Sequence, residues 1–159
     1  MKTCKLCWGV SALLIAVIAG MAYMFVIKGS TSVADDGRTA IFLSEGERDL
    51  VLAEMRGFLE GVQEITAALA ENDMKEVASS AHALGMASAG AAPASLMAKL
   101  PLEFMTMGMG THEAFDALAI EAEDLGDQKV ILTKLSDLMN NCTTCHAGYR
   151  FEVEGQKGK

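Results

Sequence analysis

The chain has 159 residues, a formal net charge of −8, 51% hydrophobic residues, 4 Cys and 11 Met. This length allows one ordinary domain plus an accessory segment and excludes a large multidomain enzyme. After Lys28 the chain carries 10 basic and 21 acidic side chains, a net charge of −11 that would repel a phosphate backbone, so nucleic-acid binding is not expected. Four cysteines grouped as two Cys-x-x-Cys pairs are too few for a disulfide-built scaffold.

Residues 8–27 form a run of 20 residues without a charge. As an α-helix this run would be ~30 Å long, the thickness of the hydrocarbon core of a bilayer, so it predicts an N-terminal transmembrane helix. Lys2 and Lys5 precede the run and Asp35 and Asp36 follow it. By the positive-inside rule we expect the bacterial inner (cytoplasmic) membrane, with the body of the protein in the periplasm.

A cleaved signal peptide is the alternative interpretation of the same segment, because residues 32–34 (Ser-Val-Ala) have the small-x-small pattern of a cleavage site. Under either interpretation, we expect the part of the protein after the apolar run to be exported from the cytoplasm. We therefore expect three parts: residues 1–28 as a membrane anchor or uncleaved signal, residues 29–43 as a linker, and residues 44–159 as a helical domain.

The first half of this domain predicts two amphipathic helices. Ser44 and Glu47 have the spacing of a capping box, which marks the start of the first helix. Apolar residues then recur at alternating steps of four and three along one helical face: Val51, Met55, Phe58, Val62, Ile65 and Leu69. Asp73 is positioned to cap a second helix, whose apolar stripe comprises Met74, Val77, Ala81 and Leu84.

The second half predicts two more helices after a long connection. Residues 85–101 are rich in small residues, and residues 102–110 continue as a Met-rich apolar stretch. Thr111 is expected to cap the third helix, and 126–127 (Gly-Asp) to end it. The inward side of this helix comprises Phe115, Leu118, Ala122 and Leu125. With a fourth helix over 128–151, the pattern predicts an all-α fold: an antiparallel four-helix bundle with an N-terminal transmembrane helix.

Cys142, Cys145 and His146 form a Cys-x-x-Cys-His sequence, the attachment motif of a c-type haem. On a helix these positions are i, i+3 and i+4, so the three side chains leave one face. The two thiols can form thioethers with the vinyl groups of the haem, and the imidazole of His146 can reach the iron as an axial ligand. The sequence therefore predicts one covalently attached haem c.

Two other uses of such a motif are a zinc site and a redox dithiol. A zinc site needs two more ligands, and after Lys28 the chain offers no further Cys and only His82 and His112. A redox dithiol of the thioredoxin type belongs to a βαβ setting, which this sequence does not predict. Cys4 and Cys7 form a second Cys-x-x-Cys pair, but Trp8 stands where a haem motif has His, so idle thiols are expected there.

Over residues 44–151 the chain resembles the class II cytochromes c, the family of cytochrome c′ and its low-spin c556-like relatives. The resemblance rests on the Cys142–His146 motif in the last helix with 149–150 (Tyr-Arg) after it, and on the first helix around 54–58 (Glu-Met-Arg-Gly-Phe). It implies a haem within a four-helix bundle, His146 as the proximal iron ligand, and a distal neighbour on the first helix. An apolar distal neighbour implies a five-coordinate iron open to NO or CO, and a Met implies a six-coordinate iron.

Met55 is the candidate distal ligand or neighbour on the predicted first helix. A shift of the resemblance by one turn instead brings Leu52 to the haem and Arg48 near its propionates, and the sequence leaves both registers open. Met55 as ordinary core filler is a third reading. His112 is a weaker alternative ligand, next to an unusual concentration of methionines in the preceding stretch: Met105, Met107 and Met109.

From these features we expect a monohaem c-type cytochrome that carries single electrons and is not an enzyme. Its acidic surface predicts a redox partner protein that is basic or membrane-bound. The alternatives are a five-coordinate gas-binding protein for NO or CO, and a haem subunit of a respiratory complex, for which Ala16 and Gly20 give a weak small-xxx-small signal. A homodimer is compatible with each of them.

Overall fold

The computed structural model describes residues 5–90, 92–124 and 126–155. Residues 1–4 of the predicted anchor, Cys4 included, lie outside the described residues. Leu125 of the predicted inward stripe and residues 156–159 also lie outside them.

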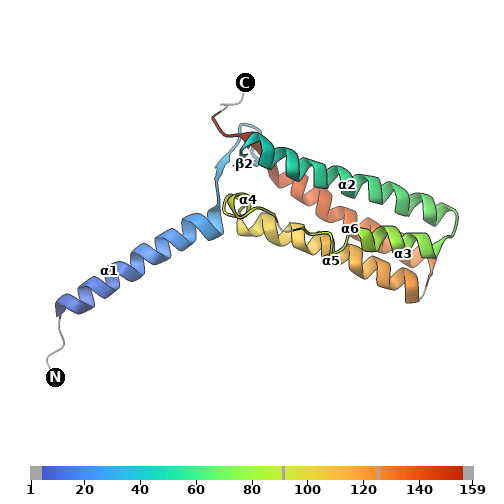
Figure 1. Ribbon diagram of the computed structural model, residues 1–159, viewed down its shortest axis with the longest axis horizontal. Helices are drawn as coiled ribbons and strands as arrows, with labels where there is room; N and C mark the ends of the chain where they lie inside the picture. Colours follow the sequence, from blue (N-terminus) through green and yellow to red (C-terminus); the bar gives the residue numbers. More distant parts are fainter. Residues whose placement is uncertain (1–4, 91, 125, 156–159) are drawn as a thin grey trace.

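Four helices form the body of the protein: α2 (Glu45–Ala70), α3 (Met74–Ala83), α5 (Leu102–Asp124) and α6 (Gln128–Gly148). Figure 1 shows them side by side, with successive helices running in opposite directions. Their inward faces share one apolar core, which comprises Ile65, Ala68, Leu69, Val77, Ala78, Ala81, Phe115, Leu118, Ala119, Ala122, Ile131, Leu135 and Leu138. A short helix, α4 (Ala94–Met97), lies in the connection before α5.

The helix starts predicted from capping residues at Ser44 and Asp73 are confirmed. Ser44 Oγ accepts a hydrogen bond from the backbone N–H of Glu47, and the Glu47 carboxylate accepts one from the backbone N–H of Ser44 at 2.9 Å. The Asp73 carboxylate likewise accepts from the N–H of Glu76 at the start of α3. The break before the last helix is confirmed too, because Gly126 takes a φ of 58° and Asp127 caps α6.

The predicted start of the third helix at Thr111 is wrong. Helix α5 already begins at Leu102, so the Met-rich stretch 102–110 is its first half. Thr111 lies in mid-helix, where its hydroxyl donates to the carbonyl oxygen of Met107 at 2.9 Å instead of capping a helix end. Gly108 and Gly110 weaken the local helix preference, but burial of Phe104 and Thr111 stabilises a continuous helix.

A small sheet at one end of the body corrects the predicted all-α class. It has the order β1 (Thr31–Val33), β2 (Thr39–Leu43) and β3 (Tyr149–Val153), so it lies partly in the predicted linker 29–43. Strands β1 and β2 are antiparallel, whereas β2 and β3 are parallel, with Thr39 opposite Tyr149. The predicted fourth helix over 128–151 therefore ends at Gly148, and the chain continues as β3.

The sheet packs on the first turns of α2 and α5 around a second apolar cluster: Ile41, Leu43, Val51, Leu96, Leu100 and Phe104. Met55, Cys145, Tyr149 and Phe151 pack against this cluster. Burial of Ile41 and Leu43 explains why the chain before α2 is ordered as a strand. The pairing of β3 with β2 therefore joins the end of α6 to the segment that precedes α2.

The predicted transmembrane helix over 8–27 is wrong. Helix α1 (Lys5–Ala22) ends within the apolar run, and the chain continues as a π-helix, η1 (Tyr23–Lys28). Among residues 5–90, 92–124 and 126–155, no helix has the combined length and apolar character needed to cross a membrane. The expected location in the inner membrane, which depended on this helix, is wrong for the same reason. Figure 1 shows α1 extending away from the helical body.

Replacing Glu47 by alanine is expected to lower the free energy of unfolding by about 1–2 kcal/mol, because it removes half of the capping box and an ion pair. The Glu47 carboxylate accepts from Lys99 Nζ at 2.6 Å, and its side chain is only 12% exposed. Urea unfolding measures the change. Glu45→Ala is the matched control, since Glu45 also lies in the first turn of α2; an equal loss in both variants would contradict this account of the cap.

The same carboxylate is expected to make stability depend on pH in the acid range. Hydrogen bonds from Lys99 and then from Ser44 lower the pKa of Glu47 from 4.5 to about 2. Its contribution is therefore complete above about pH 4.5 and is lost as the pH falls toward 2. Glu47→Gln should flatten this part of the stability–pH curve, and an unchanged slope between pH 5 and about 2 would contradict the assignment.

Candidate functional site

A cavity of about 200 Å³ lies where α2, α5, the end of α6 and the sheet meet. Its lining is mostly apolar or aromatic, with two arginines, a thiol and an imidazole. The lining residues are Arg38, Leu52, Met55, Phe104, Cys145, His146, Tyr149, Arg150 and Phe151. The cavity thus contains two of the three residues of the Cys-x-x-Cys-His sequence.

The last two turns of α6 carry that sequence. Cys145 and His146 line the cavity, and Cys142 lies one turn earlier on the same helix. Both thiols are half-buried and form no disulfide, whereas His146 is exposed. The i, i+3, i+4 spacing predicted from the sequence is therefore helical in the structure.

Burial raises the pKa of the Cys142 thiol, and burial together with the neighbouring Cys142 raises the pKa of the Cys145 thiol. A catalytic redox dithiol requires the opposite change, a lowered pKa that produces a reactive thiolate at neutral pH. The position near the C-terminal end of α6 also disfavours a thiolate, because the helix dipole is negative there. Neither the raised pKa values nor the position on α6 favours a redox pair.

Met55 and Leu52, the two candidates for the distal neighbour, both line the cavity from α2. They are three positions apart and so share one side of the helix. Arg48, the residue that the Leu52 register would place near the propionates, instead pairs with Asp49 at 2.8 Å.

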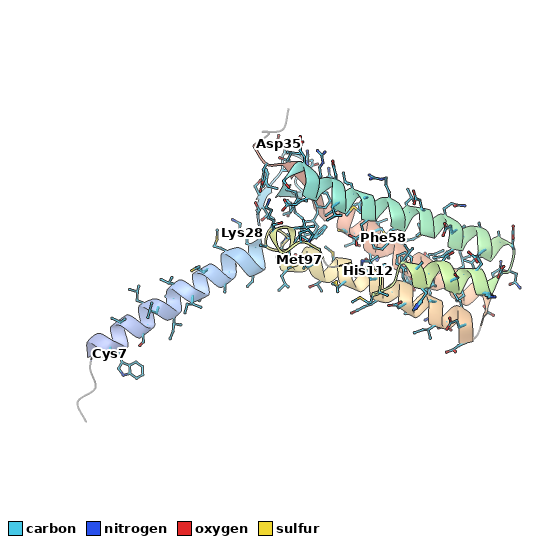
Figure 2. The ribbon with its side chains drawn as sticks, viewed as in Figure 1. Cys7, Lys28, Asp35, Phe58, Met97 and His112 are labelled. Atoms are coloured by element: carbon cyan, nitrogen blue, oxygen red, sulfur yellow. The ribbon has the colours of Figure 1, made fainter. Side chains whose placement is uncertain are left out.

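His112 lies elsewhere in the fold. It is buried on α5, where Nδ1 is 2.8 Å from the carbonyl oxygen of Leu84 and the ring lies 4.9 Å from that of Phe58. Its Nε2 is 3.4 Å from Glu54 Oε1. Figure 2 shows Phe58 and His112 in the helical body, away from the sheet end where Asp35 lies. The structure therefore does not bring His112 to the cavity with His146.

The side chain of His82 is 72% exposed, with Nδ1 3.2 Å from Asp116 Oδ1. Of the methionines before His112, Met105 packs against the second apolar cluster and Met109 is exposed.

Sequence reasoning did not predict that four further residues line the cavity: Arg38, Phe104, Arg150 and Phe151. Phe104 makes edge contacts with the rings of Tyr149 and Phe151 at 5.4 and 5.7 Å. Tyr149, Phe151 and Val153 stand at alternate positions, which is a signal for a strand. A strand here would have predicted that the rings of Tyr149 and Phe151 share one face.

Tyr149 connects α5 to the junction between α6 and β3. Its hydroxyl donates to Glu103 Oε2 at 3.0 Å. Partial burial, followed by this hydrogen bond, raises the pKa of Tyr149 to about 12. The phenol therefore stays protonated, and remains a donor, at any physiological pH.

A larger surface hollow of about 520 Å³ lies between α3 and α5, lined by Met74, Lys75, Ala78, Ser79, Ala122 and Glu123. It contains no aromatic ring, thiol or imidazole. Within the described part of the chain, no three His, Cys, Asp or Glu side chains meet in a way that would hold a metal ion. The smaller cavity at the end of α6 is therefore the better candidate for a functional site.

The residues around this cavity are of the chemical kinds that hold a c-type haem, although the cavity itself, at about 200 Å³, is smaller than a typical ligand pocket. Aromatic and aliphatic side chains provide apolar surface, His146 offers an imidazole that could bind iron, and the two half-buried thiols lie on the same helix. No family model matches the chain, and neither curated proteins nor solved structures give a significant match.

Proposed function

We propose that the protein is a monohaem c-type cytochrome, similar to the class II cytochromes c, that carries single electrons. One observation supports this proposal most: the Cys-x-x-Cys-His sequence lies beside a cavity that Leu52 and Met55 line from α2. The motif gives the means of attachment, and the cavity gives apolar surface next to it.

Each residue of the motif has a distinct role in this proposal. Cys142 and Cys145 would hold the porphyrin through thioethers, each made by addition of an S–H group across a vinyl group without an oxidant. His146 would bind the iron through a ring nitrogen. When bound, the cofactor supplies a one-electron couple. Phe104, Tyr149 and Phe151, which line the cavity, would supply apolar surface to it.

Met55 would make electron transfer the preferred activity, because its thioether sulfur could serve as a further iron ligand. Leu52 favours the second candidate, a gas-binding protein, since an apolar neighbour leaves the sixth position open to NO or CO. Both residues line the cavity, so the gas-binding protein is kept as the second candidate.

Charge favours a basic redox partner. After Lys28 the chain carries 21 acidic and 10 basic side chains, and such a surface steers a protein of opposite charge. This attraction weakens as salt screens it.

The absorption spectrum of the ferric and ferrous protein, with and without CO, tests the choice between the two functions. Low-spin bands with a Met-to-iron absorption and slow or weak CO binding support the carrier. High-spin bands with rapid CO binding support the gas-binding protein and contradict the carrier.

Replacing Met55 by alanine is expected to convert a low-spin spectrum into a high-spin one and to open the iron to CO, because the sixth ligand is lost. His112→Ala is the control, since His112 lies away from the cavity and should leave the spin state unchanged. An unchanged spectrum in Met55→Ala would contradict Met55 as the ligand, and a change in His112→Ala alone would assign that role to His112.

A further inference from the structure

Arg38 joins two parts of the chain that are more than a hundred positions apart. It lies at the end of the turn between β1 and β2, which is closed by a hydrogen bond from the N–H of Ala34 to the carbonyl oxygen of Arg38 at 2.8 Å. Its Nη1 donates to the carbonyl oxygens of His146 and Tyr149, both at 3.4 Å. Arg38 therefore binds the backbone of the proposed iron ligand itself.

The carbonyl group of His146 needs a partner from outside the helix. His146 lies in the last turn of α6, which ends at Gly148, and the last four carbonyls of a helix have no intrahelical donor. A guanidinium is favourable at this end because its charge opposes the negative end of the helix dipole. The parallel pairing of Thr39 with Tyr149 sets the residue before Thr39 against this junction.

Asp36 holds the guanidinium in place. Its Oδ2 atom accepts from Arg38 Nε at 2.9 Å, from Arg38 Nη2 at 2.7 Å and from Arg150 Nη1 at 3.2 Å. The two bonds from Arg38 converge on this one oxygen, and a guanidinium held through two of its nitrogens is restricted in its plane as a lysine ammonium is not. The hydrogen bonds from Arg38 lower the pKa of Asp36 to about 2, so the carboxylate is charged at neutral pH.

We propose that Arg38, held by Asp36, is a positioning residue that fixes the orientation of His146 as an axial ligand. This inference rests on the proposed function. Groups that orient a metal ligand commonly act on the second nitrogen of its ring. Here the restraint acts on the backbone, through the carbonyl groups on both sides of the junction between α6 and β3.

The test compares three variants in the full chain, matured in a host that attaches c-type haem: Arg38→Ala, Arg38→Lys and Asp36→Asn. Covalent haem content, the reduction potential and the ligand-sensitive bands of the spectrum are measured for each. Arg48→Ala is the matched control, because the side chains of Arg38 and Arg48 are 37% and 34% exposed, and Arg48 pairs with a neighbour on α2.

We expect Arg38→Ala to keep its haem but to shift the potential and the ligand bands beyond the difference between wild type and Arg48→Ala. Arg38→Lys should resemble Arg38→Ala, since lysine keeps the charge but not the planar fork. Asp36→Asn should change the same bands less, and it serves as the test if Arg38→Ala does not fold.

Two results would overturn the positioning role alone. One is a haem-containing Arg38→Ala or Asp36→Asn protein with the spectrum and potential of wild type. The other is an Arg38→Lys protein that recovers both, since charge alone would then explain the effect. A wild-type protein without covalent haem would instead overturn the proposed function.

Discussion

Replacing Cys142 and Cys145 together by serine is expected to abolish covalent haem and leave the purified protein colourless after denaturation. Serine hydroxyls do not add to vinyl groups, so both thioethers are lost. His146 would remain, but one imidazole does not retain a porphyrin through denaturation and dialysis. The measurement is the haem absorbance of the denatured protein, normalised to its concentration.

Cys7→Ser is the matched control for this pair. Cys7 belongs to the other Cys-x-x-Cys sequence, where Trp8 follows and no His does, and it lies on α1. We expect full haem content in this variant. Covalent haem that persists in the Cys142→Ser, Cys145→Ser protein, or that disappears in Cys7→Ser, would contradict the assignment of the attachment site.

Replacing Phe115 by alanine is expected to lower the free energy of unfolding by about 3–5 kcal/mol. Phe115 is fully buried in the core of the four helices, and its ring stacks on that of Phe58 at 5.5 Å. The substitution removes apolar contacts and leaves a space that the surrounding helices fill only in part. Urea unfolding followed by helical circular dichroism gives the change.

Leu59→Ala is the control for this core substitution. Leu59 follows Phe58 on α2, but its side chain is 71% exposed. A surface substitution of this kind changes stability by no more than about 0.5 kcal/mol. A comparable loss in both variants would contradict the position of the core.

The helix starts were predictable because they depend on neighbouring residues. The capping box joins Ser44 to Glu47, three positions away, and Asp73 caps α3 in the same local manner. The seam of α2 was predictable for a similar reason, since the 3.6-residue period alone places Ile65 and Leu69 on one face, and both are buried.

The sheet was not predictable from local pattern. Strand β2 is stabilised by β3, which lies more than a hundred positions later, and by burial of Ile41 and Leu43 against α2 and α5. No nearby residue reveals such a partner. The same limit applies to α5, where Gly108 and Gly110 indicate a break but packing at Phe104 favours a continuous helix.

The membrane prediction relied on the length of an uncharged run and on the charges that flank it. Residues 8–27 carry no charge, but the π-helix from Tyr23 divides this run in the structure. A sliding count of apolar residues cannot register a change of helix type.

At the candidate site, sequence reasoning found the residues on regular helices and missed those that the sheet supplies. Cys145 and His146 were predicted from spacing, Met55 and Leu52 from the resemblance, and all four line the cavity. Arg38 reaches the cavity only because β2 pairs with β3, so its role could not be read from residues near it in sequence.

The measurement that tests the central claim most directly is the pyridine haemochrome spectrum of the wild-type protein, together with its intact mass, after maturation in a host that attaches c-type haem. The proposal predicts one haem per chain that survives denaturation and extraction with acidified solvent. A colourless protein of unmodified mass, in which the thiols of Cys142 and Cys145 both react with an alkylating reagent, would contradict it.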